Sequence, residues 1–361
     1  VNTNQSITLT DNDIEAITGY AEGATIVFTA VITDASGNST TGTQSSTTLL
    51  VDQVIPSVSS FTMSDTALLS GETSTVTLQF SEAVTNFSSS ADITVENGSL
   101  STMTTTDNIT WTGTFTPSSS VEDATNVLTL ATTYTDTAGN APASTSTTDN
   151  YTVDTTAATV VAFTLSDSAL KIGDTATVTL QFSEAVAGFS SDADVTVQNG
   201  SLATMTSSDN ITWTGTFTPS SDVEDATNVM SLATSYTDTA GNAGPSATTD
   251  NYAVDTIRPT VAAFTMSDTA LISGETSTVT LQFSEAVASF SSDDDITVQN
   301  GSLATMTSSD NITWTGTFTP TSDVEDATNV LTLATTYTDT AGNAPASTST
   351  TDNYTVDTTA A

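Results

Sequence analysis

The chain has 361 residues, of which 42 are acidic and two are basic, and its formal net charge is −40. A polypeptide with this charge repels polyanions, so the composition argues against binding to nucleic acid or to an anionic membrane surface. The absence of cysteine and histidine excludes disulfides, a thiol nucleophile, a Cys/His zinc site and a Ser-His-Asp triad.

Internal repeats organise the sequence. The string ITWTGTFTP occurs three times, at 109–117, 211–219 and 312–320. A Val-Asp pair closes each unit and places aspartates at intervals of 102, 101 and 102 residues, at Asp52, Asp154, Asp255 and Asp357. In chain order we therefore expect an incomplete unit over 1–52, complete units over 53–154, 155–255 and 256–357, and the start of a further linker over 358–361.

Alternating apolar and polar residues predict half-buried β-strands within each complete unit. For example, Val178, Leu180 and Phe182 alternate with threonine and glutamine. Glycine- and asparagine-containing turn sequences separate such runs, which number about seven in each unit. A period near 100 residues is the size of one β-sandwich domain. The tryptophan of ITWTGTFTP shares a face with isoleucine and phenylalanine, so we expect it in the core.

A family resemblance rests on these strings taken together. The first complete unit contains TVTLQFSEAV, ITWTGTFTP, YTDTAGN and VDTTA in this order, and the other two repeat the series with small changes. The series resembles the bacterial Ig-like repeats that occur in tandem in giant surface adhesins. This resemblance implies an all-β fold of tandem Ig-like β-sandwich domains arranged as a linear rod.

The segment 1–52 departs from this pattern. Its strings VFTAVITDASGN and TTLLVD match the last two strands of a related repeat, and no first half precedes them. Either upstream sequence or another chain would supply that half.

Acidic positions are predicted to converge at each junction between units. In an Ig-type sandwich the loops after strands B and F lie at one pole, and strand G ends at the opposite pole, beside the next unit. The linker aspartate, the FSEAV glutamate, and the aspartate and asparagine of YTDTAGN would therefore meet. The predicted sets are Asp52, Glu82, Asp136 and Asn140 at the first junction, Asp154, Glu184, Asp238 and Asn242 at the second, and Asp255, Glu285, Asp339 and Asn343 at the third.

Converging carboxylates favour a bound cation. Two carboxylates about 4 Å apart repel by roughly 4 kcal/mol at an effective dielectric constant near 20, and basic side chains are almost absent. Oxygen ligands suit Ca²⁺, which extracellular modules bind with a Kd of roughly 10⁻⁴ to 10⁻³ M. The resemblance implies the same ion, since related adhesin repeats carry calcium at domain junctions. The alternative is that these acids are solvated loop residues that keep the chain soluble.

A second acidic pair recurs at the pole where strand G ends. The sequence predicts it in the loop between strands E and F, at Glu122-Asp123, Glu224-Asp225 and Glu325-Asp326. The pair either adds ligands to the same junction or caps the loop.

Together, these features favour a non-enzymatic stalk or fibre region of an extracellular bacterial adhesin, made rigid by Ca²⁺ at the domain junctions. The expected partners are calcium, neighbouring repeats or identical chains, and surface glycans. Two alternatives stay open: a self-assembling surface filament or surface-layer subunit completed by strand exchange, and a module that binds a glycan or host surface. No run reaches the roughly 18 apolar residues of a membrane span, so we expect no membrane insertion.

Overall fold

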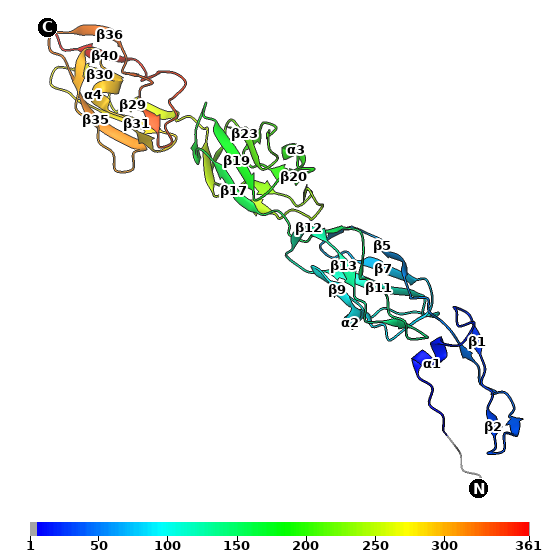
Figure 1. The fold of residues 1–361 in the computed structure, drawn as a ribbon. Coiled ribbons are helices and arrows are strands. Elements are labelled where there is room, and N and C mark those ends of the chain that lie inside the picture. Colours follow the sequence, from blue (N-terminus) through cyan, green and yellow to red (C-terminus); the bar gives the residue numbers. More distant parts are fainter. Residues whose placement is uncertain (1–5, 361) are drawn as a thin grey trace. The chain divides into compact units, whose positions relative to one another are not determined.

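The computed structural model describes residues 6–360 (Figure 1). The chain divides into two compact units, of which the first ends at Thr156 and the second begins at Ala157. The first unit holds residues 6–52, here the N-terminal segment, and residues 53–154, here repeat 1. The second unit holds nearly all of residues 155–255, here repeat 2, and residues 256–357, here repeat 3.

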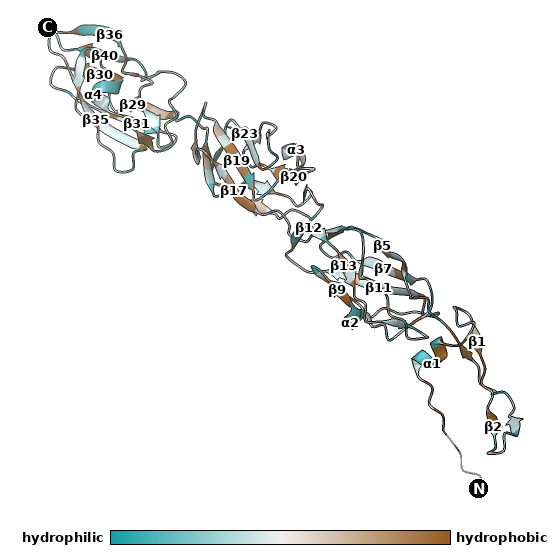
Figure 2. Ribbon diagram, in the orientation of Figure 1, coloured by the Kyte–Doolittle hydropathy of each residue, from teal (hydrophilic) through white to brown (hydrophobic). Residues whose placement is uncertain are grey.

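The N-terminal segment has little regular structure. Helix α1 (Asp11–Glu15) begins after Thr10, which forms a capping box with Asp13. Strand β1 (Thr25–Ile26) pairs with β4 (Leu49–Leu50), and β2 (Val31–Thr33) pairs with β3 (Ser39–Thr41). Figure 2 shows hydrophobic residues on β1 and β2, yet only Ile26 and Val51 of the segment's described hydrophobic residues are buried.

Each complete repeat contains the same elements in the same order, twelve short strands and one four-residue helix. In repeat 1 they are β5 (Val58–Met63), β6 (Ala67–Leu69), β7 (Ser74–Phe80), β8 (Val84–Thr85), α2 (Ser89–Asp92), β9 (Ile93–Val95), β10 (Gly98–Leu100), β11 (Thr110–Pro117), β12 (Glu122–Asn126), β13 (Leu128–Leu130), β14 (Thr135–Asp136), β15 (Ser146–Thr147) and β16 (Tyr151–Asp154). In repeat 2 they are β17 (Val160–Leu165), β18 (Ala169–Leu170), β19 (Ala176–Phe182), β20 (Val186–Ala187), α3 (Ser191–Asp194), β21 (Val195–Thr196), β22 (Gly200–Leu202), β23 (Thr212–Pro219), β24 (Glu224–Asn228), β25 (Ser231–Leu232), β26 (Thr237–Asp238), β27 (Ala247–Thr248) and β28 (Tyr252–Asp255). In repeat 3 they are β29 (Val261–Met266), β30 (Ala270–Ile272), β31 (Ser277–Phe283), β32 (Val287–Ala288), α4 (Ser292–Asp295), β33 (Ile296–Thr297), β34 (Gly301–Leu303), β35 (Thr313–Pro320), β36 (Glu325–Asn329), β37 (Thr332–Leu333), β38 (Thr338–Asp339), β39 (Ser349–Thr350) and β40 (Tyr354–Asp357).

One face of each sandwich is a four-stranded antiparallel sheet. Its strand order in repeat 1 is β10-β11-β7-β5, and repeats 2 and 3 reproduce this order with their own strands. The predicted alternation determines which side is buried: Val76, Leu78 and Phe80 of β7 are at most 1% exposed, while Thr75 and Gln79, on the other side of the strand, are exposed.

The opposite face is built from shorter pieces. In repeat 1, β6 pairs in parallel with β16, β16 pairs with β12, and β13 pairs with β9 and β15. Strands β12 and β13 are successive parts of one principal strand, and the pairing of β12 with β16 is irregular between Asp123 and Asn126. Strands β5 and β6 are likewise successive parts of the first principal strand. Counted this way, each repeat is an Ig-like sandwich of about seven principal strands, which confirms the predicted fold class.

A separate hydrophobic core fills each repeat. In repeat 1, Phe115 of the four-stranded sheet packs against Tyr151 of β16, with ring centroids 5.1 Å apart. Trp111 packs against this core and contacts Phe87 edge to face at 4.8 Å. The tryptophans of repeats 2 and 3 make the same contact, so the predicted core role is correct, although each tryptophan as a residue is only partly buried.

Candidate metal centres

The first junction brings together three predicted carboxylates. Asp52 follows β4, Glu82 follows β7 and Asp136 ends β14. Pairing of β8 with β14 places Val84 opposite Asp136, which draws the loops after β7 and β13 to the same pole. One carboxylate oxygen from each acid lies within 4.8 Å of the other two. The structure therefore shows the predicted convergence here.

A tight loop fixes Asp136. Its Oδ1 accepts hydrogen bonds from the backbone N–H groups of Ala138, Gly139 and Asn140 at 2.8, 2.7 and 2.9 Å. The Asn140 amide donates to the other carboxylate oxygen at 2.8 Å. Burial raises the pKa of Asp136, but the hydrogen bonds from Asn140 and from the loop backbone outweigh it and hold the pKa below its ordinary value.

The fourth predicted residue, Asn140, ties the loop to the linker. Besides contacting Asp136, its amide nitrogen donates to the carbonyl oxygens of Asp52 and Val54 at 3.1 and 3.3 Å. Asn140 therefore holds the loop against the linker that supplies Asp52.

A further acid at the first junction was not predicted as a ligand. Burial is the largest cause that raises the pKa of Glu82, followed by the charges of Asp136, Asp52 and Glu22. Glu22 also accepts a hydrogen bond from the backbone N–H of Gln53. The sequence carried a signal for this residue, because AEGAT at 21–25 matches VEDAT at 121–125.

The third junction reproduces this arrangement in the second unit. One carboxylate oxygen each from Asp255, Glu285 and Asp339 lies within 4.8 Å of the other two. Asp339 is 1% exposed, and its Oδ1 accepts from the N–H groups of Gly342 and Asn343 at 2.7 and 2.8 Å. The Asn343 amide donates to Asp339 Oδ2 at 2.9 Å and to the Asp255 carbonyl oxygen at 3.0 Å.

The negative charges of the carboxylates at the third junction repel one another. Burial, and then the charges of Asp339, Asp255 and Glu224, raise the pKa of Glu285 to about 7. Burial also raises the pKa of Asp255, with further contributions from Asp339 and Glu224 that a hydrogen bond from Ile257 partly offsets. Glu224 begins β24, directly opposite Asp255 in the ladder. The acidic pair Glu224-Asp225 thus lies in a strand and not in the predicted loop, because β24 pairs with the end of β28. The pairs Glu122-Asp123 and Glu325-Asp326 likewise begin strands, β12 and β36.

The predicted residues of the second junction lie in both units. Asp154 ends β16 of the first unit, opposite Glu122 in the ladder. Within the second unit, Asp238 is 1% exposed and its Oδ1 accepts from the N–H of Asn242 at 2.9 Å, while the Asn242 amide donates to Asp238 Oδ2 at 2.9 Å. Glu184 follows β19. The convergence of this set stays a prediction.

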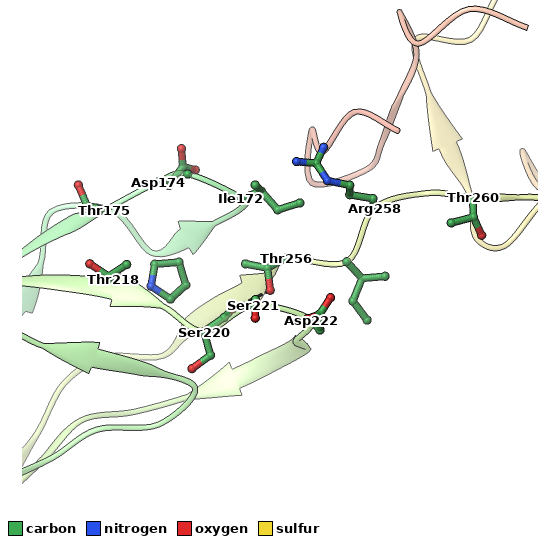
Figure 3. A pocket seen from close by; sticks show the side chains of 13 residues that line it. Ile172, Asp174, Thr175, Thr218, Ser220, Ser221, Asp222, Thr256, Arg258 and Thr260 are labelled. Carbon is green, nitrogen blue, oxygen red and sulfur yellow. Dashed lines mark hydrogen bonds between the residues drawn. The ribbon is translucent and has the colours of Figure 1, made fainter. Parts of the chain in front are cut away.

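Both basic residues of the chain lie near the third junction but bind elsewhere. Lys171 Nζ lies 3.9 Å from Asp174 Oδ2, and Arg258 donates to the carbonyl oxygen of Ala344 at 2.7 Å. Arg258 lines a cavity of about 590 Å³, whose other lining side chains are mainly hydroxyl-bearing or apolar, and it extends toward Ile172 (Figure 3).

The donor chemistry fits a hard divalent cation. Within the described residues, neither complete carboxylate set has a basic side chain in salt-bridge contact. In each set, the carboxylate oxygens come from three segments that are far apart in the sequence. Ca²⁺ binds to oxygen ligands of this kind with flexible geometry. Asp52, Glu82 and Asp136, or Asp255, Glu285 and Asp339, would hold such an ion.

Comparison with known proteins identifies the repeats. The family model described as bacterial Ig-like domain matches residues 52–153, 154–254 and 255–356. No curated protein sequence matches the chain significantly.

Solved structures give weaker likenesses. A three-domain Ig structure of titin aligns with a TM-score of 0.42 at 9% identity, covering 85% of this chain and 99% of that chain. A protocadherin GammaB4 extracellular domain aligns with a TM-score of 0.40 at 12% identity, covering 97% of this chain and 56% of that chain. Invasin, a bacterial integrin-binding protein, aligns with a TM-score of 0.28 at 13% identity, covering 92% and 72%. The family model, which spans three consecutive stretches of the sequence, carries the assignment: the chain belongs to the bacterial Ig-like domain family.

Proposed function

We propose that this chain is a non-enzymatic, structural stalk region of an extracellular bacterial adhesin, in which Ca²⁺ stiffens the domain junctions. Tandem bacterial Ig-like domains support an extracellular structural or adhesin-like role. The described helices are four or five residues long, and none could cross a membrane.

One observation supports the calcium part of this proposal above the others. At the first and third junctions, three carboxylates from three separate loops lie within 4.8 Å of one another. Burial, and then the charges of the neighbouring carboxylates, raise the pKa values of Glu82 and Glu285, so the ionised form of each cluster is unfavourable without a cation. A bound divalent ion replaces that repulsion with attraction and links the loops of one repeat to the preceding linker. Calcium would therefore convert a flexible linker into a fixed joint.

Calcium titration of the chain tests the proposal. We expect heat of binding and a rise in thermal stability at Ca²⁺ concentrations near the roughly 10⁻⁴ to 10⁻³ M typical of extracellular modules. At a hundredfold excess over Kd, each occupied site adds about 2.7 kcal/mol. Magnesium should substitute poorly, because its near-octahedral shell tolerates loop carboxylates less well. X-ray scattering in calcium and in chelator then reports whether the joints stiffen.

Paired variants locate the sites. Glu82→Gln and Glu285→Gln remove one ligand from the first and third junctions respectively, and each should abolish one class of calcium binding. Asp149→Asn and Asp352→Asn serve as controls, because these exposed carboxylates belong to neither set. Calcium binding that is equal in the wild type and in the doubly substituted Glu82→Gln, Glu285→Gln chain would refute these sites.

A second candidate function rests on the N-terminal segment. Phe28 and Leu49 are 39% and 42% exposed, while the matching Leu128 and Tyr151 of repeat 1 are both 0% exposed. Phe28 and Leu49 line an apolar groove of about 690 Å³. This groove favours the strand-exchange alternative, in which another chain completes the sheet and builds a surface filament.

The oligomeric state separates the two candidates. Light scattering of the intact chain should show concentration-dependent association if strands are exchanged, and Phe28→Ser should abolish it. Thr129→Ser, at a partly exposed position of repeat 1, is the control and should leave the association unchanged. The position equivalent to Phe28, Leu128, is buried, so a serine there would disturb the core. A monomer at all concentrations excludes exchange between copies of this chain.

A further inference from the structure

The side chain of Asn343 makes three hydrogen bonds at the boundary between repeats 2 and 3. It is 2% exposed. Its amide nitrogen donates to Asp339 Oδ2 at 2.9 Å and to the Asp255 carbonyl oxygen at 3.0 Å. Its Oδ1 accepts from the backbone N–H of Ile172 at 2.9 Å. Both N–H donors and one acceptor position are therefore used.

This network fixes which way the amide points. A flipped amide would place its NH₂ group against the N–H of Ile172 and its oxygen against two acceptor oxygens, which removes all three hydrogen bonds. The orientation is thus set by the partners of Asn343 within the chain.

The partner of Asn343 Oδ1 is the backbone of a tight turn in repeat 2. Residues Lys171 to Asp174 form a β-turn in which the Asp174 N–H donates to the Lys171 carbonyl oxygen at 3.1 Å. Gly173 has φ +86°, and Ile172 is not among the residues with positive φ, which defines a type II turn with Ile172 at its second position. The Lys171 backbone N–H also donates to Asp174 Oδ2 at 3.2 Å. The N–H of Ile172 is left to point out of the turn, toward repeat 3.

We propose that Asn343 is a positioning residue that holds repeat 3 in register on repeat 2 by direct hydrogen bonding to the 171–174 turn, without a metal ion. It links three separate segments: the loop that carries Asp339, the linker that carries Asp255, and the turn that carries Ile172. This inference rests on the proposed function, because it concerns the same junction. It adds a component of the joint that persists when calcium is removed, and it gives Asn343 a role other than that of a metal ligand.

The turn type supplies a sharp test. Proline suits the second position of a type II turn and has no backbone N–H, so Ile172→Pro removes the hydrogen bond to Asn343 and leaves the turn intact. Ile172→Ala is the matched control, because it shortens the same side chain and keeps the N–H. Asn343→Ala removes the other partner.

Distances between the repeats provide the measurement. The chain has no native cysteine, so Thr216→Cys and Thr317→Cys, at exposed positions of β23 and β35, accept spin labels without background. In excess chelator, we expect a narrow distance distribution for the wild type and Ile172→Ala, and a clearly broader one for Ile172→Pro and Asn343→Ala. With the other tryptophans replaced by phenylalanine, the fluorescence of Trp213 alone and of Trp314 alone should show that repeats 2 and 3 stay folded in every variant.

The outcomes separate this proposal from the calcium proposal. Equal distributions for Ile172→Pro and Ile172→Ala in chelator would overturn the role of Asn343. If Ile172→Pro broadens the distribution while calcium changes nothing in any variant, the positioning role stands and the calcium joint fails. Calcium added to Ile172→Pro should narrow its distribution again, because the carboxylates of the joint are untouched.

Discussion

The first and third junctions have equivalent acidic residues but differ in the hydrogen bonds that hold the neighbouring asparagine. Both place three carboxylates within 4.8 Å of one another, and both bind the linker carbonyl through the amide of an asparagine, Asn140 or Asn343. Asn343 also accepts a hydrogen bond from Ile172 of the preceding repeat and is buried, whereas Asn140 is partly exposed. The N-terminal segment, as described, contains no counterpart of the 171–174 turn. The comparison indicates that a complete preceding repeat contributes to a joint independently of the carboxylates.

The largest expected effect comes from removing the loop aspartates. Asp136→Ala removes the acceptor of three backbone N–H groups and Asp339→Ala the acceptor of two, and a hydrogen bond to a charged group contributes about 1.5–3 kcal/mol. We expect the free energy of unfolding of the affected repeat to fall by about 3 kcal/mol or more. The loss should be larger for Asp136→Ala, because the wild-type Asp136 accepts from three backbone N–H groups. A similar small loss at both sites would show that these loops do not depend on the aspartate.

Each complete repeat carries one tryptophan, which makes the measurement specific. Denaturant unfolding followed by Trp111 alone or by Trp314 alone, with the other tryptophans replaced by phenylalanine, reports on repeat 1 or repeat 3. Asp149→Ala and Asp352→Ala are exposed controls, for which changes within about 0.5 kcal/mol are expected.

The pH dependence of the third junction should differ from that of an ordinary glutamate. The pKa of Glu285 is raised from 4.5 to about 7, so the folded chain binds more protons than the unfolded chain between these values. In chelator, this contribution to stability is fully present below pH 4.5 and is lost as the pH rises through about 7. Calcium should reverse the trend, since its ligands must be deprotonated.

Carbon-13 NMR of the glutamate side-chain carboxyl groups measures both junctions in one titration. The Glu82 signal should also titrate above its ordinary pKa. Titration of Glu285 near 4.5, its ordinary value, would show that the third cluster is more open to solvent than the structure has it.

The smallest expected effect concerns Arg258. Its hydrogen bond to Ala344 is made by an exposed side chain, so Arg258→Ala should lower the stability of repeat 3 by about 0.5 to 1 kcal/mol. Ile55 occupies the matching position of the first junction, and Ile55→Arg should raise the stability of repeat 1 by a similar amount. Thermal unfolding of both variants at low and high salt checks the pair, and a loss of several kcal/mol would assign Arg258 a larger role.

Much of the fold and part of the site could be predicted from the sequence. Alternation in strings such as TVTLQF predicted the buried face of β7. The rule that the loops after strands B and F lie at one pole of an Ig-type sandwich correctly placed Glu82 and Asp136 beside the linker. The acidic pair at 224–225 was misplaced, because its residues are polar and lack the apolar alternation that marks a strand. Pairing of β24 with the end of β28, which the sequence does not display, makes them part of the ladder.

The roles of the asparagines were harder to predict. An asparagine in an acidic loop is a plausible metal ligand by residue type, and the sequence does not show where its amide oxygen and amide nitrogen point. The hydrogen bond between Asn343 and Ile172 joins residues that are 171 positions apart. Such a contact depends on how two folded repeats meet, and no local pattern encodes it.

The parallel pairing of the first and last strands determines how a repeat responds to tension. Strands β6 and β16 run side by side in the same direction, so a pull on the two ends of repeat 1 shears all their hydrogen bonds together and does not open them one at a time. This patch has three register pairs in repeats 1 and 3, but only two in repeat 2. Repeat 2 therefore has the shortest parallel patch of the three repeats.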